Sequence, residues 1–218
     1  MTQAERRRAK HDQGALRQPP GPGEATAPAQ PPVGLLQKTW ILGLAGSLLL
    51  WAAFPPLGIW PLAWIAPVPW LMLVRRDKLA GRRPYRTIWL TGCAFWLGVL
   101  HWLRLPHPAT SLGWLALSLY LAVYLPLFVG LSRAAVHRLH WPLVVAAPVV
   151  WTGLELLQAR LLTGFNMAAL GNSQFRWIEL IQVADLAGNY GVGFVVMFGA
   201  ACLARMAPCG ERRFAAWP

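Results

Sequence analysis

The sequence predicts an all-α polytopic membrane protein, a helical bundle with about six transmembrane helices. Hydrophobic residues make up 56% of the 218 residues and charged residues only 13%, about half the charged share of a soluble domain. The chain also contains 13 Trp, a residue that favours the boundary between lipid and water. The third observation is a series of apolar runs that approach the roughly 20 residues needed to cross a bilayer.

Residues 1–37 differ from the rest of the chain because they are rich in Pro, Gly, Ala and Arg. Such a stretch buries too little apolar area to offset the entropy of ordering it, so we expect disorder there. It is also too long and too polar to begin a signal peptide. The expected organisation is a basic, Pro-rich cytoplasmic tail over 1–37, a membrane helical domain over 38–207 and a short basic tail over 208–218.

Six apolar runs follow the tail and are the predicted spans. The run 112–132 is the clearest of them, whereas the run 57–74 contains Pro61, Pro67 and Pro69. Prolines are tolerated in a spanning helix where neighbouring groups satisfy the freed carbonyls. The predicted spans are residues 39–54, 57–74, 87–103, 112–132, 141–158 and 190–207.

The charges between these runs predict the orientation. The connection 75–86 is dense in Arg and Lys, whereas the turn 55–58 carries no charge. Basic and non-basic connections alternate in register with the spans, as the positive-inside rule requires. We therefore expect both termini in the cytoplasm and the long connection 159–189 outside.

The net charge of +12 would suggest nucleic-acid binding in a soluble protein. Here the basic residues lie mostly in the tail and between apolar runs, so orientation explains them and no nucleic-acid partner is expected. The thiols of Cys93, Cys202 and Cys209 form no CxxC or Cys/His spacing, which predicts no metal site. We interpret the cysteines as structural, since a thiol in an apolar run behaves as a small hydrophobe. No cofactor is predicted.

The segment "LLTGFNMAALGNSQ", residues 161–174, is polar and punctuated by glycine although it lies between apolar stretches. Because this segment is predicted to lie outside the bilayer, its polar groups cost little free energy there. The following "QFRWIELIQVADLAG" places apolar residues at helical spacing. This pattern fits a short helix in the membrane interface, and a helix packed against the spans fits the periodicity equally well.

Four blocks occur in a fixed order over residues 40–200: "LAGSLLLWAAFPPLGIWPLAWIAPVPWLML", "GCAFWLGVLHWL", "APVVWTGLELLQARLLTGFNMAALGNSQ" and "QVADLAGNYGVGFVV". With them the chain resembles the membrane half of apolipoprotein N-acyltransferase, a multi-pass enzyme of the bacterial inner membrane. One departure is Asn166-Met167, where many relatives have Pro-Trp, and this change bears on substrate fit.

The resemblance implies two substrates, a phospholipid acyl donor and a diacylated lipoprotein acceptor. The family's catalytic Glu, Lys and Cys lie in a periplasmic nitrilase-like domain, and no residue of this chain matches them. We therefore assign no catalytic residue and expect the chain to be inactive alone. A separately encoded nitrilase-like part is one candidate partner.

Five residues are the candidate substrate-binding residues. Glu155 is the one acid inside an apolar run, so it should face protein or water rather than lipid. It either contacts a lipid head group or forms a structural hydrogen bond. Arg160 could pair with Glu155 or with a lipid phosphate. Gly164 allows a tight turn, and the amides of Asn166 and Gln174 suit a docking edge.

Two other functions stay open at this point. One is a small membrane transporter subunit, which inverted repeats and a charged path through the bilayer would favour; the sequence shows neither. The other is a non-enzymatic membrane scaffold that recruits a separate catalytic chain.

Overall fold

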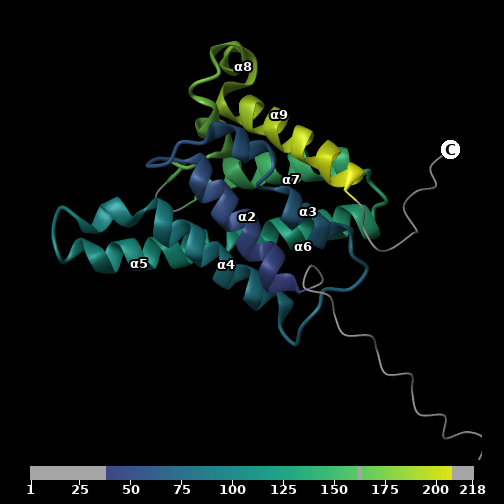
Figure 1. The fold of residues 1–218 in the computed structure, drawn as a ribbon, viewed down its shortest axis with the longest axis horizontal. Helices are drawn as coiled ribbons and strands as arrows, with labels where there is room; N and C mark the ends of the chain where they lie inside the picture. Colours follow the sequence, from purple (N-terminus) through teal and green to yellow (C-terminus); the bar gives the residue numbers. More distant parts are fainter. Residues whose placement is uncertain (1–37, 162–163, 208–218) are drawn as a thin grey trace, which may run out of the picture. The chain divides into compact units, whose positions relative to one another are not determined.

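The computed structural model describes residues 38–161 and 164–207, and every regular element in them is helical. The predicted tails 1–37 and 208–218 lie outside these residues. So does Thr163 in residues 159–174, which we call the outer loop after their predicted position. In chain order the elements are α2 (Thr39–Ala53), η2 (Trp60–Trp64), α3 (Val68–Arg75), α4 (Pro84–Val99), η3 (His101–Arg104), α5 (Thr110–Leu121), α6 (Tyr124–His137), α7 (Leu143–Gln158), η4 (Leu170–Gln174), α8 (Ile178–Ile181) and α9 (Ala184–Met206), where η marks a 3-10 helix (Figure 1).

The predicted helical class is confirmed, and the number of crossings stays a prediction. Two helical stretches are long and apolar enough to cross a membrane, namely the 28 residues Thr110–His137 and the 23 residues Ala184–Met206. The apolar helices Thr39–Ala53 and Leu143–Gln158 have 15 and 16 residues, fewer than the roughly 20 of a straight crossing.

The predicted span 57–74 is wrong as a single helix. It contains the short η2, then a break, then the eight-residue α3. Proline explains the break, because Pro67 has no N–H to donate and its ring clashes with the carbonyl one turn earlier. Pro61 and Pro69 lie in the first turns of η2 and α3, where the missing N–H costs no helical hydrogen bond.

The predicted span 112–132 is interrupted as well. Residues 122–123 form a turn between α5 and α6. Pro126 lies in the first turn of α6 and cannot donate to the carbonyl of Ala122, which accepts instead from the Leu125 N–H at 3.3 Å. The two helices therefore meet at a tightened turn.

Aromatic side chains hold the centre of the bundle. Trp70 of α3 stacks on Trp151 of α7 with ring centroids 5.9 Å apart, and Phe128 of α6 meets Trp151 edge-on at 5.0 Å. The indole N–H of Trp70 donates to the Gly43 carbonyl of α2 at 3.1 Å. This aromatic group therefore joins the pair α2 and α3 to the pair α6 and α7, and α4 and α9 pack on α2 and α7 respectively.

The ends of several helices meet at one end of this bundle. The guanidinium of Arg75, in the last turn of α3, donates to the carbonyls of Ala204 and Ala207 at the end of α9. The Thr39 hydroxyl at the start of α2 donates to the Ala80 carbonyl at 2.6 Å. The start of α2, the end of α9 and the loop after α3 are thereby brought together.

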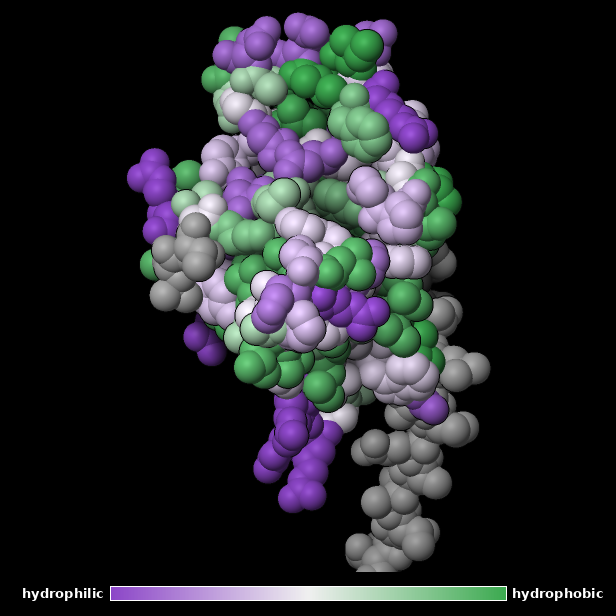
Figure 2. Space-filling view, turned by 90° about the vertical axis from the view of Figure 1, so that its left-hand side faces the viewer, coloured by the Kyte–Doolittle hydropathy of each residue, from purple (hydrophilic) through white to green (hydrophobic). Residues whose placement is uncertain are grey.

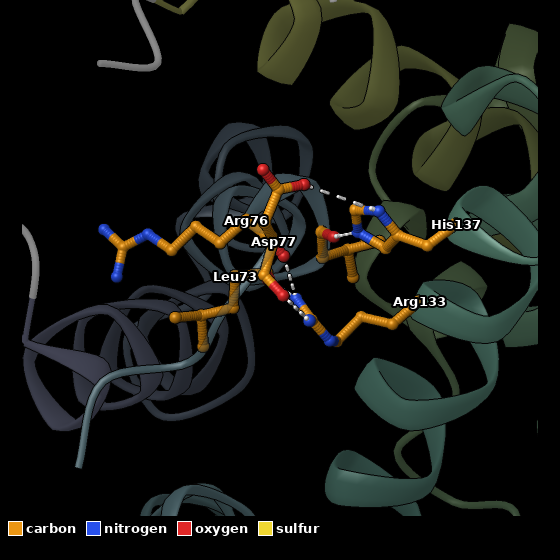
Figure 3. A network of polar contacts seen from close by, with 6 residues as sticks. Leu73, Arg76, Asp77, Arg133 and His137 are labelled. Carbon is orange, nitrogen blue, oxygen red and sulfur yellow. Dashed lines mark hydrogen bonds and ion pairs between the residues drawn. The ribbon is translucent and has the colours of Figure 1, made fainter. Parts of the chain in front are cut away.

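Two side chains of α6 cap the end of α3 (Figure 3). Arg133 donates to the carbonyls of Leu73 at 2.9 Å and Asp77 at 3.0 Å. The His137 Nε2 lies 2.8 Å from the Val74 carbonyl. Side-chain N–H donors at a helix C-terminus satisfy its free carbonyls, and a charged donor such as the Arg133 guanidinium also interacts favourably with the helix dipole. The C-terminal end of α6 therefore lies at the same end of the bundle.

Candidate functional site

A buried carboxylate lies near the end of α7. Glu155 is only 6% exposed. Its Oε1 accepts from the indole N–H of Trp151, one turn earlier, at 2.9 Å and from the backbone N–H of Leu170, which opens η4, at 2.7 Å. Glu155 therefore faces protein, as the apolar context of its helix predicts, and it ties the outer loop to α7.

The other oxygen of this carboxylate forms no hydrogen bond within the part of the chain that the structure describes. Glu155 Oε2, Ser47 Oγ and Asn166 Oδ1 are all buried atoms of this kind. The three residues come from α7, α2 and the outer loop, and all of them line one cavity of about 50 Å³. That volume accommodates a few water-sized groups.

Apolar and aromatic side chains form most of the remaining wall of this cavity. They are Leu50, Trp70, Phe95, Trp96, Tyr124, Leu125, Trp151 and Leu154. A mainly apolar wall with a few convergent polar atoms is typical of sites that orient a small ligand. The cavity can therefore receive a small hydrogen-bond donor at its polar atoms.

A side chain of α7 holds the outer loop by a hydrogen bond to the backbone of the loop. Gln158 is 7% exposed and its Nε2 donates to the Phe165 carbonyl at 2.9 Å. Gly164 has φ of 62°, a left-handed conformation that glycine adopts without a Cβ penalty. A Cβ there would also lie 3.1 Å from the Ala159 carbonyl. The predicted role of Gly164 in a tight turn therefore has a direct geometric basis.

Gln174 lies at the other end of this loop and is fully buried. Its Oε1 accepts from the indole N–H of Trp64 at 3.0 Å, and its Nε2 donates to the Trp60 carbonyl at 3.3 Å. Trp177 packs against Trp60 and Trp64 with ring centroids 5.4 and 5.9 Å apart. Gln174 therefore joins η4 to η2 and does not line the cavity.

Of the five candidate residues, the structure brings only Glu155 and Asn166 to the cavity. Arg160 is exposed, and the proposed pairing with Glu155 is not formed, because that carboxylate is bound by Trp151 and Leu170. Sequence reasoning missed Trp151 and Ser47. Trp151 could have been found, since residues four apart lie on one helix face; Ser47 comes from a distant helix and gives no such signal.

The segment 174–188 does not form the continuous short helix that its periodicity suggests. Its helical parts are the single turn α8 and the start of α9, which carries non-helical angles at Ala187 and Gly188. Gly188 has φ of 61° and ψ of −166°, a combination that is easy only for glycine. Asp185 lies in the first turn of α9 and makes no capping hydrogen bond there.

Replacing Gly171 with alanine should destabilise the chain by about 1–3 kcal/mol, the usual cost of overpacking. A Cβ at this position would lie 2.2 Å from Asn189 Oδ1 and 2.5 Å from the Asn189 carbonyl oxygen. Gly153→Ala is the matched control, because nothing lies within 4 Å of its Cβ position and alanine favours a helix interior. Unfolding in detergent measures both; equal stabilities would contradict this packing of η4 on α9.

Comparison with known proteins identifies the family. Residues 46–202 match the family model described as the apolipoprotein N-acyltransferase N-terminal domain. The chain is 37% identical over 163 residues to the apolipoprotein N-acyltransferase of Rhodopirellula baltica, covering 70% of this chain and 28% of that protein. It is 35% identical over 180 residues to that of Geobacter metallireducens, covering 78% and 34%.

The chain thus spans about a third of the length of these curated relatives. The matched region runs from Gly46 to Cys202. It includes the residues that line the cavity and the whole outer loop. The chain therefore belongs to the apolipoprotein N-acyltransferase family and corresponds to its N-terminal domain.

Proposed function

We propose that this chain is the membrane domain of a bacterial apolipoprotein N-acyltransferase. It holds a phospholipid acyl donor and a diacylated lipoprotein acceptor so that their reactive groups meet at the outer membrane surface. The observation that carries the proposal is the buried polar centre of Glu155, Ser47 and Asn166 between apolar helices inside the region that matches the family.

The surface of the described residues supports a place in the bilayer. Many large apolar side chains are exposed, among them Leu48, Leu90, Leu112, Leu131 and Phe198, all 44–77% exposed. On the face shown in Figure 2, hydrophobic residues are spread among hydrophilic ones. An apolar surface of this extent is unusual on a soluble monomer, and hydrocarbon covers it without cost. The chain is proposed to be multi-pass, with both termini in the cytoplasm.

The reaction implied by the family has two steps. An enzyme cysteine attacks an acyl ester of the phospholipid, forming a thioester and releasing a lysophospholipid. The α-amino group of the lipoprotein's N-terminal cysteine then attacks the thioester, forming an amide and returning the thiol. Covalent catalysis splits one difficult transfer into two easier ones. This chain would contribute orientation, which can account for several kcal/mol of the barrier, up to about 7–11 in the best cases.

Glu155 is proposed to act as a positioning residue in this domain. It fixes the start of η4 through the Leu170 N–H, and Gln174 fixes the end of η4 on η2. The outer loop, which these two contacts hold in place, is proposed to face the periplasm, where the acyl chains and the catalytic part meet. The unpaired oxygens of Glu155, Ser47 and Asn166 suit the amine or hydroxyl of a lipid head group.

Cysteine labelling tests this placement. A single cysteine at Lys78 should resist a membrane-impermeant maleimide in intact cells, and one at Glu179 should react, because the basic loop is inside and α8 outside. Both side chains are exposed, so access depends on the membrane alone. The background carries serine at Cys93, Cys202 and Cys209. Labelling at Lys78→Cys from outside would contradict the orientation and with it the proposed role of the outer loop.

A further inference from the structure

One end of the bundle carries a group of exposed cations that the acyltransferase function does not use. They are Lys38, Lys78, Arg82, Arg83, Arg86, Arg138 and Arg205, and we call them the basic surface. Within the part of the chain that the structure describes, none of these side chains has a hydrogen bond or ion pair with another residue. Their charges are therefore available to a partner.

Hydrogen bonds between elements bring these residues to the same end. Lys38 precedes α2, whose Thr39 is bonded to Ala80 in the loop after α3. Arg205 lies in the last turn of α9, next to the Ala204 carbonyl that Arg75 binds. Arg138 follows α6 directly, beside His137, which contacts the Val74 carbonyl. Lys78, Arg82, Arg83 and Arg86 belong to the loop itself and to the first turn of α4.

Other basic side chains at this end already have partners within the chain. Arg75 donates to carbonyls at the end of α9. Arg133 donates to carbonyls at the end of α3, and His137 lies 3.9 Å from Asp77 Oδ1 (Figure 3). Asp77 is the only acid of this loop. In Figure 2 hydrophilic side chains project from the lower end of the molecule, where Figure 1 places the loop between α3 and α4.

We propose that the basic surface is a binding site for the head groups of anionic phospholipids in the leaflet that it faces. Two observations favour lipid over a soluble anion. The cations flank the ends of apolar helices, so they lie at head-group level when the helices are in the bilayer. Clusters of four to eight Lys and Arg beside a membrane helix are typical of such recognition. Arg83 and Arg86 are three residues apart at the start of α4, a spacing that places both near one face of the helix.

Lipid selectivity in reconstituted vesicles tests the proposal on the full chain. The measured quantity is the association constant of spin-labelled phosphatidylglycerol relative to spin-labelled phosphatidylcholine. The wild-type chain should prefer phosphatidylglycerol severalfold. The double variant Arg83→Gln, Arg86→Gln should lose at least half of that preference. High salt should weaken the wild-type preference as well, because exposed charges are screened.

A second double variant is matched to the first in charge and exposure. Arg104→Gln, Arg176→Gln also removes two exposed arginines, but from outside the basic surface, and should keep the wild-type preference. An equal loss in both variants would show that total charge sets the preference, and no loss in the first would show that the surface does not select lipid. Either result overturns the proposal. Because acyl transfer is not measured, its failure leaves the proposed enzymatic role untouched.

Discussion

Glu155→Ala should lower the free energy of unfolding by about 2–5 kcal/mol. The substitution removes the oxygen that accepts from both the Trp151 indole and the Leu170 N–H. Each buried donor left without a partner costs about 1–3 kcal/mol. It also releases the anchor between α7 and η4, so the outer loop should become accessible to protease. Equilibrium unfolding in detergent and limited proteolysis measure these two effects.

Two further variants make this result specific. Glu155→Gln keeps an oxygen that can accept from Trp151 and Leu170, so it should remain close to wild type in stability. Glu179→Ala removes a carboxylate of α8 that is exposed, and surface changes of this kind usually stay within about 0.5 kcal/mol. If Glu155→Ala were as stable as Glu179→Ala, the anchoring role would be wrong.

The Glu155→Gln variant also distinguishes a positioning role of Glu155 from a role in proton transfer. In an active enzyme that contains this domain, Glu155→Gln should retain substantial acyl transfer, because it preserves the loop geometry without the charge. A loss of activity as complete as that caused by removing the family's catalytic cysteine, in a folded protein, would instead assign Glu155 a direct chemical role.

The sequence was sufficient for the class of the fold and for the burial of Glu155. A composition with half the usual charge allows few solutions other than apolar helices, and a carboxylate in an apolar run must face protein or water. The ordered blocks of residues 40–200 also indicated the family that the comparisons then confirmed.

The sequence was not sufficient for the breaks within the apolar runs. Hydropathy averages over about 20 residues and does not register where a proline removes one hydrogen bond, as at Pro67. The cavity could not be predicted either, because Ser47 lies far along the chain from Glu155 and Asn166 and meets them only through packing. Arg160 shows the opposite error, since proximity in sequence to Glu155 produced no contact.

The second large effect concerns catalysis by the chain itself. Thiol catalysis needs a thiolate activated by a neighbouring base or cation. Cys93 is buried in α4 and Cys202 is half-buried in α9, and within the described residues neither forms an ion pair with a charged group. Ser173 is bonded to the Leu170 carbonyl and the Gln174 amide, and neither of these is a base. We therefore expect no acyl transfer by residues 1–218 alone.

Mass spectrometry of a diacylated lipopeptide, incubated with phospholipid and purified protein, tests this account most directly. The 218-residue chain should give no N-acylated product. A chimera in which it replaces the matching region of the Geobacter metallireducens relative should give that product, because the domain then positions lipids for a catalytic part. N-acylated lipopeptide from the chain alone, or an inactive but folded chimera, would contradict the assignment of this chain as the lipid-positioning domain of the enzyme.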